Sequence, residues 1–529
     1  MERCKLSTDI IETPITTTEE PPIAVLAPRG STRWNAIARF GAYGCSILIN
    51  LFTIPFLISK LGVEAYGVIG IIASLINIMS IATSALTSTV GRNMTFRVER
   101  REFEEANKEI STAVFATIRI FLFAALPLCI LAFYIEYLIK IPAALVSSAH
   151  FLFLITAVSF AISTLSGPIG ASMFVRNRLD IFSGIALLRS IFFLALLVFL
   201  FNSWPATFIT YGIAVLASSI LVFVLTLRYH YVLLPGISIS ARWYDKKNLH
   251  EIVALGGWMT VIQIGMLLYM QSDLLVANRV LGVLAAGQLA AISVIPIQLR
   301  SLSALIIGLF APNQTALAAQ GDYTKFNTYL LRTVRIMTLS MAVFVGIFCG
   351  SAQQILSLWL GESFGSFALL AIVFTAHLVI NLGVLPLGGA LLALGNLKSL
   401  AISTLILGVV NVLMCIFLAG TLQMGLMGIA IADLVTITLR NLIYTPWLTA
   451  RICGLNYWSL MREIALGVAA TLVISGISYG FTAFFQPKSL LMLAVVLICA
   501  MAVSGLAVLP FILKSARVHD DVANSSLAR

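Results

Sequence analysis

Fourteen long apolar segments follow one another along the 529-residue chain, and they limit its fold more than any other feature. Apolar residues make up 60% of the chain and charged residues only 10%, whereas soluble proteins carry about 25% charged residues. Because about 20 apolar residues suffice for a helix to cross a bilayer, we expect an all-α polytopic membrane protein with no large soluble catalytic domain. The expected spans are 34–58, 66–90, 113–139, 150–172, 181–202, 206–227, 252–278, 284–310, 336–358, 366–390, 399–420, 425–439, 464–485 and 489–513.

Basic residues alternate between the two sides of this arrangement. The loops after even-numbered spans up to the twelfth hold 18 Lys and Arg residues, and the opposite loops hold four. Cytoplasmic loops of membrane proteins are enriched in Lys and Arg, so the pattern predicts that both termini are cytoplasmic. We interpret the net charge of +11 as a sign of orientation and of attraction for anionic lipids or an anionic substrate, and not as nucleic-acid binding.

The sequence repeats itself at an offset of 220 residues. Leu61–Gly67 and Leu281–Gly287 both read LGVxAxG, and Pro168–Gly170 matches Pro386–Gly388 at an offset of 218. An even number of spans per repeat gives both halves the same topology, so we expect two homologous six-helix bundles related by a pseudo-twofold axis along the membrane normal. The predicted domains are a disordered cytoplasmic tail (1–32), a first bundle (33–230), a linker (231–250), a second bundle (251–450), helices 13 and 14 (451–513) and a second tail (514–529).

Helices 13 and 14 lie outside the repeat, and their apolar runs hold no charge. We therefore expect them to provide an apolar surface for a lipid tail or a packing partner, and not a site for a charged head group.

Few polar side chains fall inside the spans, where a charge costs roughly 2.5–3.5 kcal/mol at a helix centre. Several follow helical spacing, which would place them along one face of a span. We interpret them as a cationic cavity for phosphate and sugar hydroxyls, because the arginine fork makes two charge-assisted hydrogen bonds to phosphate. Snorkelling and hydrogen bonding between helices are the structural alternatives. The candidate substrate-binding residues are Asn35, Arg39, Asn50, Asn77, Arg189 and Arg300.

Three further residues are candidates for ion coupling: Asp273, His377 and Asp433. Histidine titrates near neutral pH and could couple proton movement, so H+ or Na+ would be the coupling ion. The alternatives are a salt bridge of Asp273 with Arg279, a paired Asp433 and a hydrogen-bonded His377. The sequence has no Walker motif, no catalytic motif and no Cys/His metal spacing. We therefore expect no catalytic residue, no bound metal and no other cofactor, and we interpret the cysteines as small apolar residues.

Two segments resemble a known family. Pro55–Gly67 is similar to the start of the bacterial polysaccharide repeat-unit flippases, and Gln271–Val276, Leu281–Gly282 and Ala286–Gly287 repeat the pattern. These are the O-antigen and exopolysaccharide translocases of the multidrug/oligosaccharidyl-lipid/polysaccharide exporter (MOP) superfamily.

The resemblance implies that the chain flips an undecaprenyl-diphosphate-linked oligosaccharide across the bacterial inner membrane by alternating access. It implies as partners the lipid-linked oligosaccharide, membrane lipids, a polysaccharide polymerase and a chain-length regulator. A cation-coupled drug exporter and a lipid II flippase of the same superfamily stay open as alternatives. A membrane polymerase or ligase is disfavoured, because no expected outer loop is long enough to hold catalytic residues.

The charge pattern makes a topological prediction. Reporters fused after Leu513 or within 245–249 should be cytoplasmic, and a reporter within 361–366 should be on the outer side. Alkaline phosphatase and fluorescent-protein fusions measure this directly. A reversal at any of the three positions would mean that the span count is wrong.

Overall fold

The computed structural model describes residues 30–527, and within this range it contains helices and no strand. Twelve helices are long and apolar enough to cross a membrane, or thirteen if a bent helix pair counts as one span. The described chain is therefore an all-α, multi-pass membrane protein, as predicted. Except for residues 30–32, the predicted N-terminal tail lies outside the described residues.

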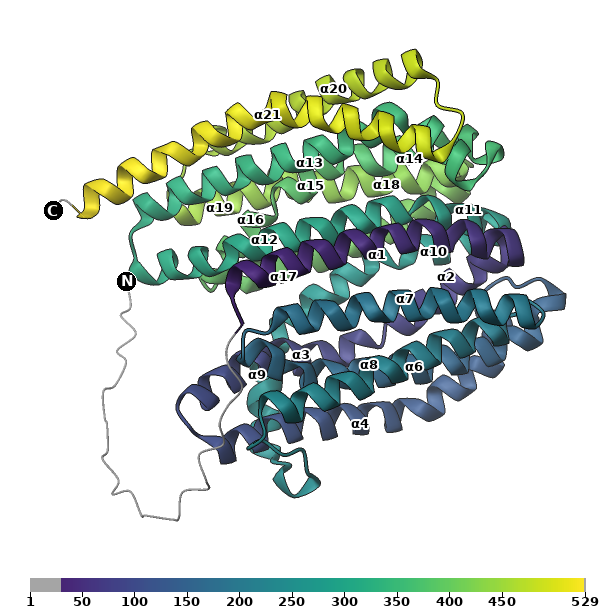
Figure 1. Cartoon of the computed structure of the whole chain (residues 1–529), viewed down its shortest axis with the longest axis horizontal. Coiled ribbons are helices and arrows are strands. Elements are labelled where there is room, and N and C mark those ends of the chain that lie inside the picture. The colour runs from purple at the N-terminus through teal and green to yellow at the C-terminus, as the bar shows by residue number, and fades with distance from the viewer. Residues whose placement is uncertain (1–29, 528–529) are drawn as a thin grey trace.

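The N-terminal lobe consists of helices that pack mainly on one another (Figure 1). They are α1 (Thr32–Leu61), α2 (Val63–Asn77), α3 (Ser80–Glu99), α4 (Phe103–Phe133), α5 (Ile135–Leu138), η1 (Ala143–Leu145), α6 (Val146–Val175), α7 (Leu179–Ser203) and α8 (Phe208–Leu233). The expected span at 66–90 is not one helix, because the chain breaks between α2 and α3.

The C-terminal lobe follows a short turn, η2 (Ala241–Trp243). Its first part consists of α9 (Lys246–Met270), α10 (Ser272–Val276), η3 (Ala277–Leu281), α11 (Val283–Ile292), α12 (Val294–Gln320), α13 (Tyr323–Leu360), η4 (Glu362–Phe367), α14 (Ala368–Ala376), α15 (Leu378–Gly383) and α16 (Leu385–Ala393). Its second part consists of α17 (Leu397–Ile416), η5 (Phe417–Thr421), α18 (Gly425–Leu439), η6 (Arg440–Tyr444), α19 (Thr445–Cys453), α20 (Tyr457–Phe485) and α21 (Leu490–Leu527). The bent pair is α9 and α10, which meet at 41°.

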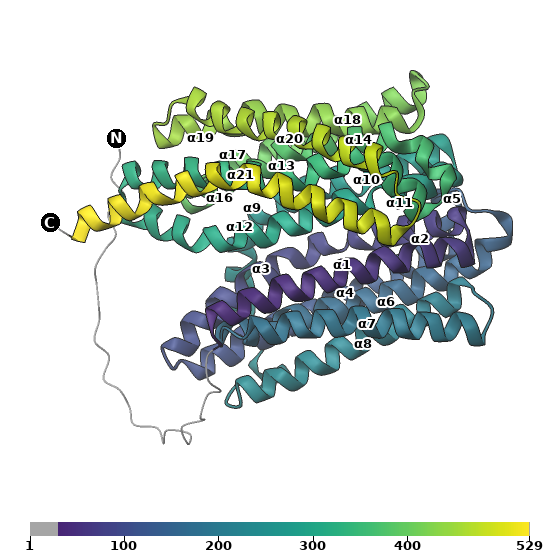
Figure 2. The same ribbon diagram turned by 45° about the horizontal axis from the view of Figure 1, so that its top comes forward.

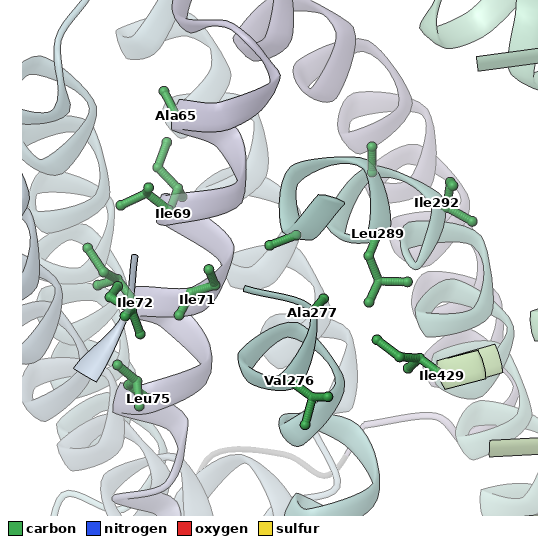
Figure 3. Close-up of a cluster of buried hydrophobic side chains, with 14 of the residues drawn as sticks. Ala65, Ile69, Ile71, Ile72, Leu75, Val276, Ala277, Leu289, Ile292 and Ile429 are labelled. Atoms are coloured by element: carbon green, nitrogen blue, oxygen red, sulfur yellow. The ribbon is translucent and has the colours of Figure 1, made fainter. Parts of the chain in front are cut away.

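The helices run between two ends of the molecule. We call the end where α1 begins and α21 finishes the proximal end, and the end at Gly62 and Gly282 the distal end (Figure 1). The two lobes share one hydrophobic core near the distal end, where α2 packs on α10 and α11 and Ile429 of α18 belongs to the same cluster (Figure 3). Toward the proximal end each lobe has its own core, built around Met94 and Ile110 in one lobe and Phe326 and Leu330 in the other. The lobes therefore share one apolar core at the distal end, and α9 also packs on α3 of the N-terminal lobe.

Helices α20 and α21 run along the C-terminal lobe in both views (Figures 1 and 2), and α20 packs closely on α13. Small residues allow this approach, since a Cβ on Gly350 would clash with the carbonyl oxygen of Ser475. The expectation that the thirteenth span brings no buried charge is wrong. Glu463 is 2% exposed and forms a two-fold ion pair with Arg335, with Nε–Oε2 and Nη2–Oε1 distances of 2.5 and 2.7 Å. This ion pair thus connects α20 to α13 of the second bundle.

Removing this ion pair should destabilise the lobe. Glu463→Gln leaves the Arg335 guanidinium, whose side chain is 27% exposed, without its carboxylate. Breaking a fully buried pair costs about 3 kcal/mol, and partial exposure of one partner lowers this cost. We expect the thermal unfolding midpoint of the purified protein to fall clearly. Arg462→Gln is the matched control, because the Arg462 side chain is 75% exposed and exposed pairs contribute about 0–1 kcal/mol. Equal melting of both variants would show that the buried pair adds nothing.

Candidate transport site

The predicted polar residues of α1, which follow helical spacing, do not line a single cavity. Asn35 is 3% exposed, and its side-chain amide donates to the carbonyl oxygen of Asn177 at 2.6 Å. Its own side-chain oxygen accepts the backbone N–H of Asp180 at 3.1 Å. Asn35 therefore fastens the start of α1 to the turn between α6 and α7, at the proximal end.

The middle of α1 faces the other lobe. The Tyr43 hydroxyl donates to the backbone carbonyl of Gln298 on α12 at 2.5 Å. Arg39 lies one turn before Tyr43, and Arg300 follows Gln298 by two residues. The structure thus brings together the two helices that carry Arg39 and Arg300. Arg39 is half-buried and forms no ion pair or hydrogen bond with the rest of the described chain.

The other predicted polar residues of the N-terminal lobe lie in two different places. Asn50 and Arg189 both line a cavity of about 630 Å³ between α1, α6, α7 and α8. Asn77 is half-buried at the end of α2, where the chain breaks before α3. The sequence could not predict this division, because helical spacing gives the face of a residue but not the element that packs on it.

The acidic candidates of the C-terminal lobe form one cluster. Asp273 on α10 and Asp433 on α18 are 8% and 2% exposed. One ligand atom each from Asp273, Asp433 and Cys415 lies within 4.8 Å of the others, close enough to hold one cation. Arg300 on α12 interacts electrostatically with both carboxylates. Two carboxylates thus face a single arginine inside a membrane-spanning bundle.

Helix α17 completes this cluster with residues that the sequence analysis missed. The Asn411 amide donates to Asp433 Oδ1 at 2.9 Å, and its oxygen accepts the Thr436 hydroxyl at 2.5 Å. The Cys415 Sγ atom lies 3.7 Å from Asp273 Oδ1 and donates a hydrogen bond to it, so this cysteine does more than fill apolar space. Asn411 and Cys415 are four residues apart, and their shared helical face was the available signal.

His377 belongs to a separate hydrogen-bonded chain. Arg440 donates to Asn441, Asn441 to Asn381, and the Asn381 amide to His377 Nδ1 at 2.6 Å. Because Nδ1 accepts, the neutral ring carries its hydrogen on Nε2. Nε2 is buried and has no hydrogen-bond partner among the described residues. This series of hydrogen bonds fixes the orientation of the His377 ring. None of these bonds involves a residue of the acidic cluster.

The distal contact between the lobes is formed by the repeated motif itself. A Cβ on Gly67 would lie 2.6 Å from the backbone nitrogen of Gly287, and a Cβ on Gly287 would clash with the carbonyl oxygen of Val63. Positions 67 and 287 are 220 residues apart, as are 63 and 283, so each half presents the same residues to the other. Nearby, Asn278 exchanges two hydrogen bonds with the Lys140 backbone, at 2.7 and 3.0 Å.

Comparisons with known proteins agree with this architecture, although no family model matches the sequence. The chain is 34% identical over 430 residues to the "Uncharacterized membrane protein EpsK" of Bacillus subtilis (strain 168), which covers 81% of this chain and 85% of the relative. The chain belongs to the polysaccharide flippase family of the MOP superfamily. The chain is also 23% identical over 426 residues to a "Putative O-antigen transporter" of Shigella flexneri, which covers 79% of this chain and 98% of the relative.

Solved structures of the MOP superfamily share the fold. The lipid II flippase MurJ in an inward closed conformation matches 91% of the chain and all of its own length, with a TM-score of 0.64 at 15% identity. An inward-facing multidrug resistance MATE transporter matches 82% of the chain and 98% of its own, with a TM-score of 0.61 at 16% identity. These likenesses confirm the two-lobe helical architecture that the repeat predicts.

The glycine contact predicts a specific effect of one methyl group. Gly287→Ala should keep the lobes apart at the distal end, because the new Cβ would meet the Val63 carbonyl. Spin labels at Glu64 and Leu284, which are equivalent and exposed, measure this separation by double electron–electron resonance. We expect the distance distribution to shift to longer values. Gly184→Ala on α7 is the control, because a Cβ there meets nothing within 4 Å. An unchanged distribution in Gly287→Ala would contradict the role of the contact.

Proposed function

We propose that this chain is a secondary transporter that flips an undecaprenyl-diphosphate-linked oligosaccharide repeat unit across the bacterial inner membrane by alternating access. The observation that carries the proposal is the distal core shared by two lobes whose proximal cores are separate. Membership of the flippase family gives this arrangement its transport context. The basic loops favour a cytoplasmic proximal end. In this orientation the molecule is closed toward the outside, the state in which a substrate made in the cytoplasm enters.

The polar groups available to a substrate favour an anionic saccharide over a cationic drug. Arg39 has no counterion in the described chain, and Arg189 lines a cavity whose described lining contains no carboxylate. Fixed cations lower the barrier for moving an anionic group through a low-dielectric layer. The chain would then be a transporter and not an enzyme, and the polymerase and chain-length regulator of the same polysaccharide would use its product.

The acidic cluster of the C-terminal lobe is the proposed coupling site. Asp273 and Asp433 together carry one more negative charge than Arg300 neutralises, and an uncompensated charge in the membrane interior is unfavourable. A proton or Na+ bound between Asp273, Asp433 and Cys415 would restore neutrality. The cluster joins α10, α17 and α18, so its occupancy would change how these helices pack. Cation binding could thereby favour one conformation of the two lobes.

This proposal predicts that neutralising one carboxylate separates transport from its ion gradient. In a flippase-deleted strain, the chain should restore surface polysaccharide, and Asp433→Asn should reduce it at least tenfold at equal membrane protein level. In proteoliposomes containing lipid-linked oligosaccharide, an imposed Na+ or pH gradient should accelerate flipping by the parent chain but not by Asp433→Asn.

Asp322→Asn is the matched control, because Asp322 caps α13 outside the cluster. Gradient-driven flipping by Asp433→Asn would remove the cluster from coupling. A parent chain that flips no lipid-linked oligosaccharide under any gradient would overturn the proposed function.

A further inference from the structure

The N-terminal lobe contains a cavity that the coupling site does not explain. Its volume is about 630 Å³, within the range of small-molecule sites. Helix α8 lines it from Tyr211 to Thr226, and fifteen residues of α-helix rise about 22 Å. The walls come from α1, α6, α7 and α8, all in one lobe. The cavity is therefore long enough for a sugar ring and far larger than one bound ion.

Hydroxyl and amide groups line this space on all four helices. Six of them are Ser46, Asn50, Ser163, Ser166, Ser190 and Ser218. Apolar groups such as Phe193 and Val215 alternate with them. Hydroxyl-bearing and amide side chains can both donate and accept hydrogen bonds, as sugar hydroxyls do. These polar groups therefore suit the hydroxyl groups of a saccharide.

Among the described residues that line the cavity, Arg189 is the one with a charge. It is accessible on the wall and forms no ion pair with another described residue. Tyr211 of α8 lines the same cavity and offers a neutral hydroxyl group, not a counterion. A guanidinium without a carboxylate, inside a membrane-spanning lobe, needs an anion from a ligand to become neutral.

A second cavity leads from this space toward the proximal end. It measures about 390 Å³ and shares Gly167 of α6 with the first cavity. Its lining adds Arg92 and Thr95 of α3 and contains no carboxylate among the described residues. The two cavities thus adjoin at Gly167, and each has one arginine in its described lining.

We propose that the N-terminal cavity is a subsite for one acidic sugar residue of the transported oligosaccharide. The sugar carboxylate binds the Arg189 guanidinium through two parallel hydrogen bonds, and the ring hydroxyls bind the serines and Asn50. A single carboxylate matches the single cation, whereas a diphosphate carries more charge than Arg189 neutralises. This subsite rests on the proposed function for its substrate, but its chemistry can be tested without transport.

The test uses the purified full-length chain in nanodiscs with three free probes: glucuronate, glucose and inorganic pyrophosphate. Saturation-transfer difference NMR titrations report binding of the two sugars, and broadening of the 31P resonance reports binding of pyrophosphate. We expect glucuronate to bind at least tenfold more tightly than glucose. Arg189→Gln should abolish this preference, and Arg189→Lys should keep part of it, since lysine retains the charge without the fork. Asn50→Ala should weaken both sugars, because it removes a partner for hydroxyl groups.

Arg119→Gln is the matched control, because the Arg119 guanidinium stacks 4.0 Å from the Tyr244 ring and does not line the cavity. It should keep the preference for glucuronate. Three results would each overturn the subsite. The parent chain shows no preference for glucuronate over glucose, Arg189→Gln keeps that preference, or Arg189→Gln loses binding of pyrophosphate and not of glucuronate.

An export experiment in cells tests the subsite independently of the proposed transport function. In cells that make repeat units differing only in one carboxylate, Arg189→Gln should lower export of the acidic unit at least tenfold and spare the neutral one. Equal loss of both units would make Arg189 a structural residue. Glucuronate binding through Arg189 in a chain that flips nothing would overturn the function and leave the subsite standing.

Discussion

The interface between the lobes depends on two positions that carry no side chain. At Gly67 and Gly287 the backbones of α2 and α11 approach so closely that a methyl group on either would meet the other helix. Lipid tails are as apolar as leucine, so helices in a bilayer associate through close packing and not through hydrophobic burial from water. The apolar residues that surround the two glycines can share one core only at this helix separation. Closure of the distal end therefore follows from backbone geometry.

The charges that matter are divided between the lobes. The C-terminal lobe buries two carboxylates that interact electrostatically with Arg300, and the N-terminal lobe presents Arg189 to a cavity whose described lining has no acid. Because they lie in different lobes, the carboxylates and Arg189 do not form ion pairs with each other. A cation in one lobe and an anion in the other would therefore communicate only through relative motion of the lobes. This division suits coupled transport, because neither ligand can replace the other at its site.

Much of the fold was predictable from the sequence, since apolar length and the repeat are local or periodic properties. The LGVxAxG motif predicted two equivalent halves, although it did not predict that the motif contacts its own copy. The site was less predictable, because partners in a helical bundle lie far apart in sequence. Arg335 and Glu463 are separated by 128 residues, and Glu463 precedes the apolar run of its span. Asn35 likewise follows the expected stripe but binds a turn 142 residues away.

The distal contact also has a meaning for the origin of the chain. Each half offers the same residues to the other, so the contact is isologous in the sense used for twofold-symmetric dimers. A half-length ancestor with this motif could have paired with an identical copy through the same glycine. Fusion of two copies would then preserve an existing interface and free each half to diverge elsewhere. The acidic cluster and the arginine-lined cavity, each present in one half, are what such divergence would produce.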